Sequence, residues 1–105
     1  MNEQRLKMLQ QLLTENPNDC FLHHAMGIEY FSSEKFSEAI DSFKKAIAIN
    51  ENYLASYYQI GQSLEKTGNL SDAKNFYLKG IEIARIQNNK KTEGELNQAL
   101  WLLED

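Results

Sequence analysis

Cysteine and proline are nearly absent from this sequence of 105 residues, and each scarcity excludes a kind of protein. Cys20 is the single cysteine, so no internal disulfide can form, and metal sites built on paired cysteines are excluded. Pro17 is the single proline, and no simple-sequence linker divides the chain. We therefore expect one domain over residues 1–105, with a core of modest size.

Basic charge and long apolar runs are also lacking. The net charge is −4 and the eleven lysines and arginines are scattered, which argues against a nucleic-acid partner. No apolar segment is long enough to cross a membrane, and the first residues, MNEQRLKMLQQLL, lack the apolar core of a secretion signal. We expect a cytoplasmic protein that binds neither nucleic acid nor membrane.

Helical periodicity is what the sequence has in abundance. Short polar breaks separate six helical segments, which we expect at roughly 3–15, 20–32, 34–49, 54–67, 70–87 and 92–104. Connections this short predict antiparallel packing of neighbouring helices. Ser33 is the expected N-cap of the third segment, and Thr92 with Glu95 has the form of a capping box for the last.

Internal repetition with a period of 34 residues is the strongest signal in the chain. Small residues fall on small ones and bulky residues on bulky ones, as in the pairs Gly27 and Gly61, Ala39 and Ala73, Phe43 and Tyr77, and Ile47 and Ile81. The match extends over two helices and the turn between them. Such a pattern is typical of a stacked helical array.

The repeat resembles the tetratricopeptide repeat, whose signature W-x₂-L-G-x₂-Y is followed by A-x₃-F and then by P. The first copy reads His23-x₂-Met26-Gly27-x₂-Tyr30 and Ala39-x₃-Phe43, and the second reads Tyr57-x₂-Ile60-Gly61-x₂-Leu64 and Ala73-x₃-Tyr77. Departures are His23 in place of a large aromatic residue, and Glu51 and Arg85 in place of the prolines. The helices can therefore run further at those two junctions.

The resemblance implies an all-α fold, a right-handed superhelical array of antiparallel helix pairs. Residues 1–19 would form an N-terminal half repeat, residues 20–53 and 54–87 two full repeats, and residues 88–105 a capping helix. The last helix carries an apolar stripe at i, i+3, i+4 and i+7, formed by Leu96, Ala99, Leu100 and Leu103. It enters the repeat register only after about five extra residues, so a longer helix should precede it.

Glycine in mid-helix costs about 1 kcal/mol relative to alanine, so Gly27 and Gly61 need a compensating role. We expect them where the two helices of a pair approach closely, facing Ala39 and Ala73. By the same pattern His23 should pack in the core.

A second apolar stripe lies about 120° from the core stripe on helix 20–32, formed by Phe21, His24, Ile28 and Phe31. In proteins that the chain resembles, the first helix of each repeat lines a concave groove that holds a peptide or a partner helix. Corresponding positions in the second repeat are polar, and they include Tyr58, Gln62 and Glu65, with Lys66 beside them. We therefore expect a non-catalytic protein-binding groove, lined by Phe21, His24, Ile28, Phe31, Tyr58, Gln62, Glu65 and Lys66, with apolar anchoring and polar selectivity.

Other uses of that stripe stay open, because it could close a homodimer or be covered by the N-terminal helix. Trp101 lies about 140° from the Leu96 stripe and either packs against the preceding helix or contacts a partner.

No catalytic, metal or cofactor site is expected. His23 and His24 point about 100° apart and cannot share one metal ion, and no base is placed beside Cys20. Some members of the family hold a carboxylate with basic residues of the groove. The corresponding positions here carry His24, Ile28, Gln59 and Gln62, so an acidic tail is not the expected ligand.

Overall fold

The computed structural model describes residues 3–104, and in that range it contains six helices and no strand. The helices are α1 (Glu3–Glu15), α2 (Cys20–Ser32), α3 (Phe36–Ile49), α4 (Leu54–Lys66), α5 (Leu70–Ile86) and α6 (Lys90–Leu103). The all-α prediction is confirmed. Residues 1, 2 and 105 of the expected domain lie outside the described residues.

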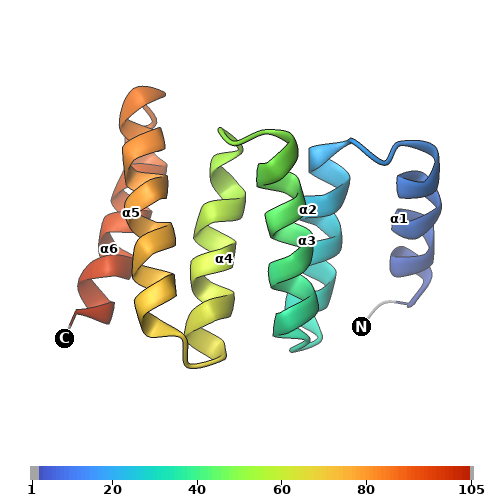
Figure 1. The fold of residues 1–105 in the computed structure, drawn as a ribbon, viewed down its shortest axis with the longest axis horizontal. Coiled ribbons are helices and arrows are strands. Elements are labelled where there is room, and N and C mark those ends of the chain that lie inside the picture. The colour runs from blue at the N-terminus through green and yellow to red at the C-terminus, as the bar shows by residue number, and fades with distance from the viewer. Residues whose placement is uncertain (1–2, 105) are drawn as a thin grey trace.

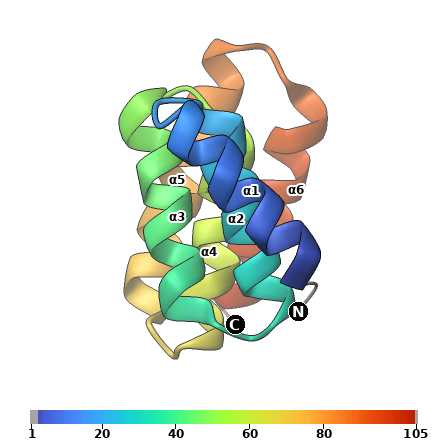
Figure 2. The ribbon, with the colours of Figure 1, turned by 90° about the vertical axis from the view of Figure 1, so that its right-hand side faces the viewer.

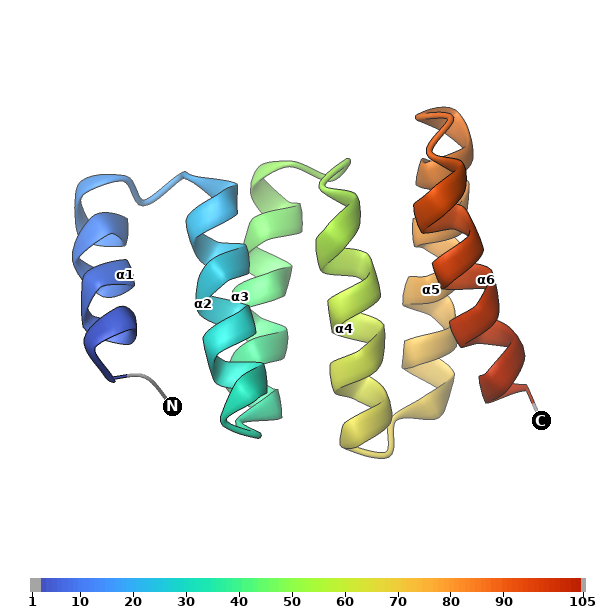
Figure 3. The same ribbon diagram turned by 180° about the vertical axis from the view of Figure 1, so that it is seen from behind.

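The helices alternate in direction and form a row 40 Å long (Figure 1). α2 pairs with α3 and α4 with α5, and α6 packs against α5, as the view from behind also shows (Figure 3). α1 departs from the row, because it crosses α2 obliquely at the N-terminal end (Figure 2). This crossing decides which side chains α1 brings to α2.

Both helix starts predicted from caps are wrong. Ser33 ends α2 as its C-cap, and α3 begins only at Phe36 because Glu34 adopts a left-handed backbone with φ of 60°. α6 begins at Lys90, because the side chain of Asn89 accepts a hydrogen bond from the Thr92 backbone and caps the helix earlier. A capping box at Thr92 is therefore excluded.

The repeated glycines lie against the repeated aromatic rings. A Cβ atom on Gly27 would overlap the ring of Phe43, and one on Gly61 would overlap the ring of Tyr77. The close helix approach is confirmed, but the expected facing residues were wrong, since the nearest atoms belong to the rings rather than to Ala39 or Ala73. Both rings are completely buried.

His23 does not lie in the core, which corrects the prediction from the repeat pattern. It is partly exposed, and its Nε2 lies 2.8 Å from the backbone oxygen of Pro17 in the connection from α1 to α2. The buried positions around it are taken by Leu22 and Met26, which pack with Leu9 of α1.

The two junctions that lack proline behave differently. α3 stops at Ile49 and the chain turns, with the Glu51 backbone oxygen accepting a hydrogen bond from the Tyr57 hydroxyl at 2.7 Å. α5 runs past Arg85 to Ile86 and has 17 residues against 14 in α3. The prediction of a longer helix is confirmed at Arg85 and wrong at Glu51.

α6 closes the C-terminal end of the core. Leu96 is completely buried and Ala99 nearly so, while Leu100 and Leu103 pack at the edge of the same cluster. Leu96 follows Tyr57 by 39 residues, five more than the repeat, and this shift puts Leu100 in the place of Gly27 and Gly61. A leucine there leaves no room for an aromatic ring from a further helix packed in the same way.

Candidate interaction groove

The residues predicted for the groove divide between two separate pockets. Phe21, His24 and Ile28 of α2 line one pocket together with α1, here called the α1–α2 pocket. Tyr58, Gln62 and Glu65 of α4 line another together with α6, here called the α4–α6 pocket. Because Ile28 and Gln62 are 34 residues apart, the two pockets occupy equivalent positions of successive repeats.

The α1–α2 pocket has a volume of about 330 Å³ and an apolar lining of Arg5, Met8, Leu9, Phe21, His24, Ala25, Ile28 and Glu29. Phe21 is 60 % exposed and Met8 is 55 % exposed. α1 therefore covers only part of the second apolar stripe. Large exposed apolar side chains beside a hollow are typical of a contact surface.

A buried ion pair joins α1 to α2 at this pocket. Arg5 Nη1 lies 2.8 Å from Glu29 Oε1, and the Glu29 side chain is only 7 % exposed. A carboxylate so far removed from water needs such a partner, because burial of an unpaired charge costs several kcal/mol, roughly. Sequence reasoning missed Arg5, Met8 and Glu29, since the oblique crossing of α1 is not encoded in the repeat.

His24 forms a wall of the α1–α2 pocket and also a link to the second repeat. Its Nδ1 lies 2.8 Å from Ser56 Oγ of α4, and its ring contacts Phe43 and Tyr53 with centroids 5.2 and 5.3 Å apart. Burial lowers the pKa of the His24 imidazole below its ordinary value of 6.5. One ring nitrogen is thus already engaged within the protein.

Two of the predicted groove residues line neither pocket. Phe31 is half-buried and packs edge-on against Phe36, with ring centroids 5.3 Å apart. Lys66 is exposed at the end of α4. Their part in binding stays a prediction.

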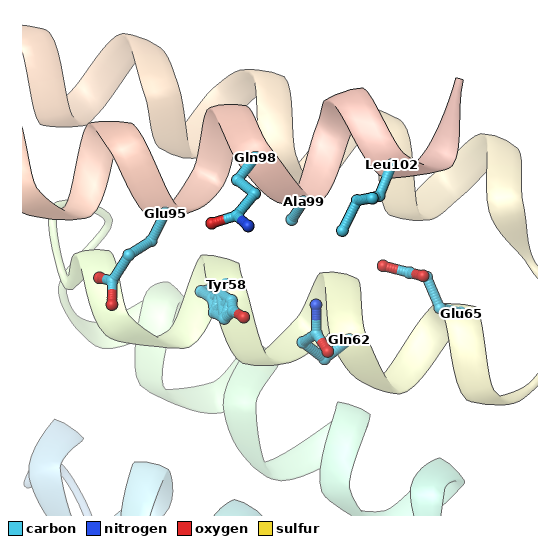
Figure 4. A pocket seen from close by; sticks show the side chains of 7 residues that line it. All are labelled: Tyr58, Gln62, Glu65, Glu95, Gln98, Ala99 and Leu102. Atoms are coloured by element: carbon cyan, nitrogen blue, oxygen red, sulfur yellow. The ribbon is translucent and has the colours of Figure 1, made fainter. Parts of the chain in front are cut away.

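The α4–α6 pocket has a volume of about 380 Å³ and is lined by Tyr58, Gln62, Glu65, Glu95, Gln98, Ala99 and Leu102 (Figure 4). Two carboxylates are the charged groups of this lining, and no basic side chain belongs to it. The three polar or apolar α6 residues Glu95, Gln98 and Leu102 were missed because the five-residue shift hides their repeat positions.

Tyr77 connects the core to this pocket. Its ring is buried against Gly61, while its hydroxyl accepts a hydrogen bond of 2.7 Å from Gln62 Nε2 and donates a short one to Glu65 Oε2. Burial and the bond to Glu65 raise the pKa of the Tyr77 hydroxyl strongly, so the phenol stays protonated. Two pocket side chains are therefore held by one buried residue.

Trp101 is 67 % exposed, which leaves little of its ring for packing against α5. Leu102, its neighbour, is also exposed and lines the α4–α6 pocket. A contact of Trp101 with a partner stays a prediction.

The described residues contain no group of three or more histidine, cysteine, aspartate or glutamate side chains able to hold a metal ion. Burial and then the Asp19 carboxylate raise the pKa of the Cys20 thiol, the opposite of activation. Within residues 3–104, the helices are too short or too polar to span a membrane.

A row of antiparallel helix pairs, stacked at a period of 34 residues, defines an α-helical repeat protein of the class that binds other proteins. Residues 27–68 match the model of the TPR repeat, and residues 54–87 match the model of the tetratricopeptide repeat. The chain belongs to the tetratricopeptide repeat family.

Relatives and solved structures agree with this assignment. A tetratricopeptide repeat domain protein from Salinibacter ruber is 30 % identical, with a TM-score of 0.78 over 84 % of this chain and 89 % of that one. The Hsp70-Hsp90 organising protein of Plasmodium falciparum is 28 % identical over 96 residues, which are 91 % of this chain and 37 % of that protein.

The TPR2B domain of yeast Sti1, solved in a complex with pHsp70, has the same fold at 17 % identity. Its TM-score is 0.89 over 94 % of this chain and 79 % of that one. This chain therefore spans well under half of the curated relative but most of the solved single domains.

Proposed function

We propose that the chain is a non-catalytic protein-interaction domain that holds a peptide or helix of a partner along α2, α4 and α6. The observation that carries this proposal is the pair of pockets at equivalent positions of successive repeats, one apolar and one polar. A single ligand segment passing along these helices would meet both. The single unpaired cysteine supports a cytoplasmic location.

Apolar anchoring would supply most of the affinity. A leucine or phenylalanine side chain of the ligand, placed against Phe21, Met8 and Ile28, would remove apolar surface from water on both partners. Full burial of such a side chain is favourable by about 1.5–3 kcal/mol. The polar pocket would then select among ligands, because its side chains are left without solvent partners by a ligand that cannot bond to them.

The family assignment supports a role in protein–protein interaction. Among proteins of this fold, the Sti1 domain was solved with pHsp70 bound, and the Plasmodium relative is by its name an organiser of two chaperones. The identity of this chain's partner does not follow from these likenesses.

A library of displayed random dodecapeptides tests the proposal directly. We expect enriched sequences with a bulky apolar residue, and a Phe21→Glu variant that no longer binds them. Leu78→Glu, a change of the same kind at an exposed leucine of α5, should bind as the wild type does. Folding of all three proteins is checked by circular dichroism.

Failure to enrich any peptide, or equal binding by Phe21→Glu, would contradict the groove. A homodimer is the second candidate, favoured by the exposure of Phe21 and Met8. Sedimentation velocity at several concentrations decides between the two: a dimer that Phe21→Glu dissociates would assign the apolar stripe to self-association.

A further inference from the structure

The two repeats differ at one buried position, and the surface above it differs in the same sense. In the first repeat the ring against the glycine is Phe43, and the nearby positions of α2 are apolar, Ile28 and Phe31. In the second repeat the ring is Tyr77, and the equivalent positions of α4 are Gln62 and Glu65. The added hydroxyl therefore accompanies a change from an apolar to a polar surface.

The hydroxyl of Tyr77 determines how these two side chains are held. It donates to Glu65 Oε2 and accepts from Gln62 Nε2, so both side chains are tied to a ring that cannot move without opening the core. A carboxylate has a second oxygen that can also accept hydrogen bonds. Glu65 is thus oriented while keeping an acceptor for a ligand.

The charge of the pocket is of one sign. Glu95 lies beside Tyr58 at one end and Glu65 lies near Leu102 at the other, with Gln62 and Gln98 between them (Figure 4). Neither carboxylate belongs to any of the salt bridges found within residues 3–104. A ligand carboxylate would be repelled here, whereas a cationic side chain would be attracted by both ends.

We propose that the α4–α6 pocket binds a lysine or arginine side chain of the partner segment, with Tyr77 as the residue that positions Glu65 and Gln62 for it. Guanidinium and ammonium groups are donors only, and carboxylates are the acceptors that bind them most strongly. The amide oxygens of Gln62 and Gln98 add further acceptors. This inference rests on the proposed function and specifies the chemistry of its ligand.

The peptides selected from the random library test the inference. We expect arginine or lysine at a constant distance from the bulky apolar residue, and replacement of that arginine by citrulline, its neutral isostere, should weaken binding about tenfold. In the variant Glu65→Gln/Glu95→Gln the arginine and citrulline forms should bind equally. Glu51→Gln/Glu82→Gln makes the same change of net charge at exposed sites and should keep the tenfold preference.

Tyr77→Phe tests the positioning role, because it keeps the buried ring and removes only the hydroxyl. The arginine peptide should lose affinity by about twofold to tenfold, while the citrulline peptide should be little affected. A merely structural effect of the hydroxyl would weaken both peptides alike.

The outcomes separate the two proposals. Peptides that bind through Phe21 but show no preference for arginine over citrulline, or that carry acidic residues, would overturn the cationic ligand and leave the groove in place. Failure to select any peptide would overturn the proposed function itself.

Discussion

His24 Nδ1 and Ser56 Oγ lie 2.8 Å apart and join the first helices of the two repeats. The pair lies beside the buried rings of Phe43 and Tyr53, so the imidazole is packed on the interior side of α2 while its edge reaches the α1–α2 pocket. A contact that links successive repeats contributes to their coupling, because each repeat of an array is stabilised by its neighbours.

Stability should fall as the pH drops below the ordinary pKa of histidine. Burial lowers the pKa of folded His24, so below pH 6.5 the unfolded chain binds the proton more readily and folding loses free energy. We expect urea unfolding to show lower stability at about pH 5.5 than at about pH 7.5. His24→Asn should reduce this difference; an identical pH dependence in the variant would show that other groups cause it.

Gly27→Ala should destabilise the protein by about 1–3 kcal/mol, because the new methyl group overlaps the ring of Phe43. Thermal unfolding measures the loss. Gly94→Ala is the matched control, since nothing lies within 4 Å of its Cβ position, and it should stabilise α6 by about 0.5–1 kcal/mol. Equal behaviour of the two alanine variants would refute the close approach of α2 and α3.

Arg5→Gln should loosen α1 from the rest of the chain. The change takes the guanidinium from the buried Glu29 carboxylate, which we expect to cost about 1–3 kcal/mol. Hydrogen exchange should then quicken in α1 more than in α4. Lys79→Gln, at an ion pair exposed on both sides, should change stability by less than about 1 kcal/mol.

Leu96 and Trp101 should differ sharply in their effect on stability, although both belong to α6. Leu96→Ala removes a completely buried side chain and should cost about 2–5 kcal/mol. Trp101→Ala should cost less than about 1 kcal/mol because the ring is mostly exposed. A large loss from Trp101→Ala would mean that its ring packs within the protein or in a dimer, which sedimentation would distinguish.

Part of the candidate site could be found from the repeat register alone. Phe21, Ile28, Tyr58, Gln62 and Glu65 stand at positions that the helical period places on one face, and each lines a pocket. The α6 side of the second pocket could not be found in this way. The insertion before α6 shifts its register, and the sequence pattern does not tell which face of a capping helix turns toward α4.

The amino-acid sequence by itself determined the helices, the 34-residue repeat and the need for glycine beside a bulky side chain. These features depend on the period of the helix and on local sterics, which act between residues close in sequence or equivalent in the repeat. Only the tertiary structure decided that His24 rather than His23 is turned inward, and that the groove residues divide between two pockets. Those outcomes depend on how α1 and α6 cross their neighbours, because a side chain's surroundings are set by the helix packed over it and not by its own helical face.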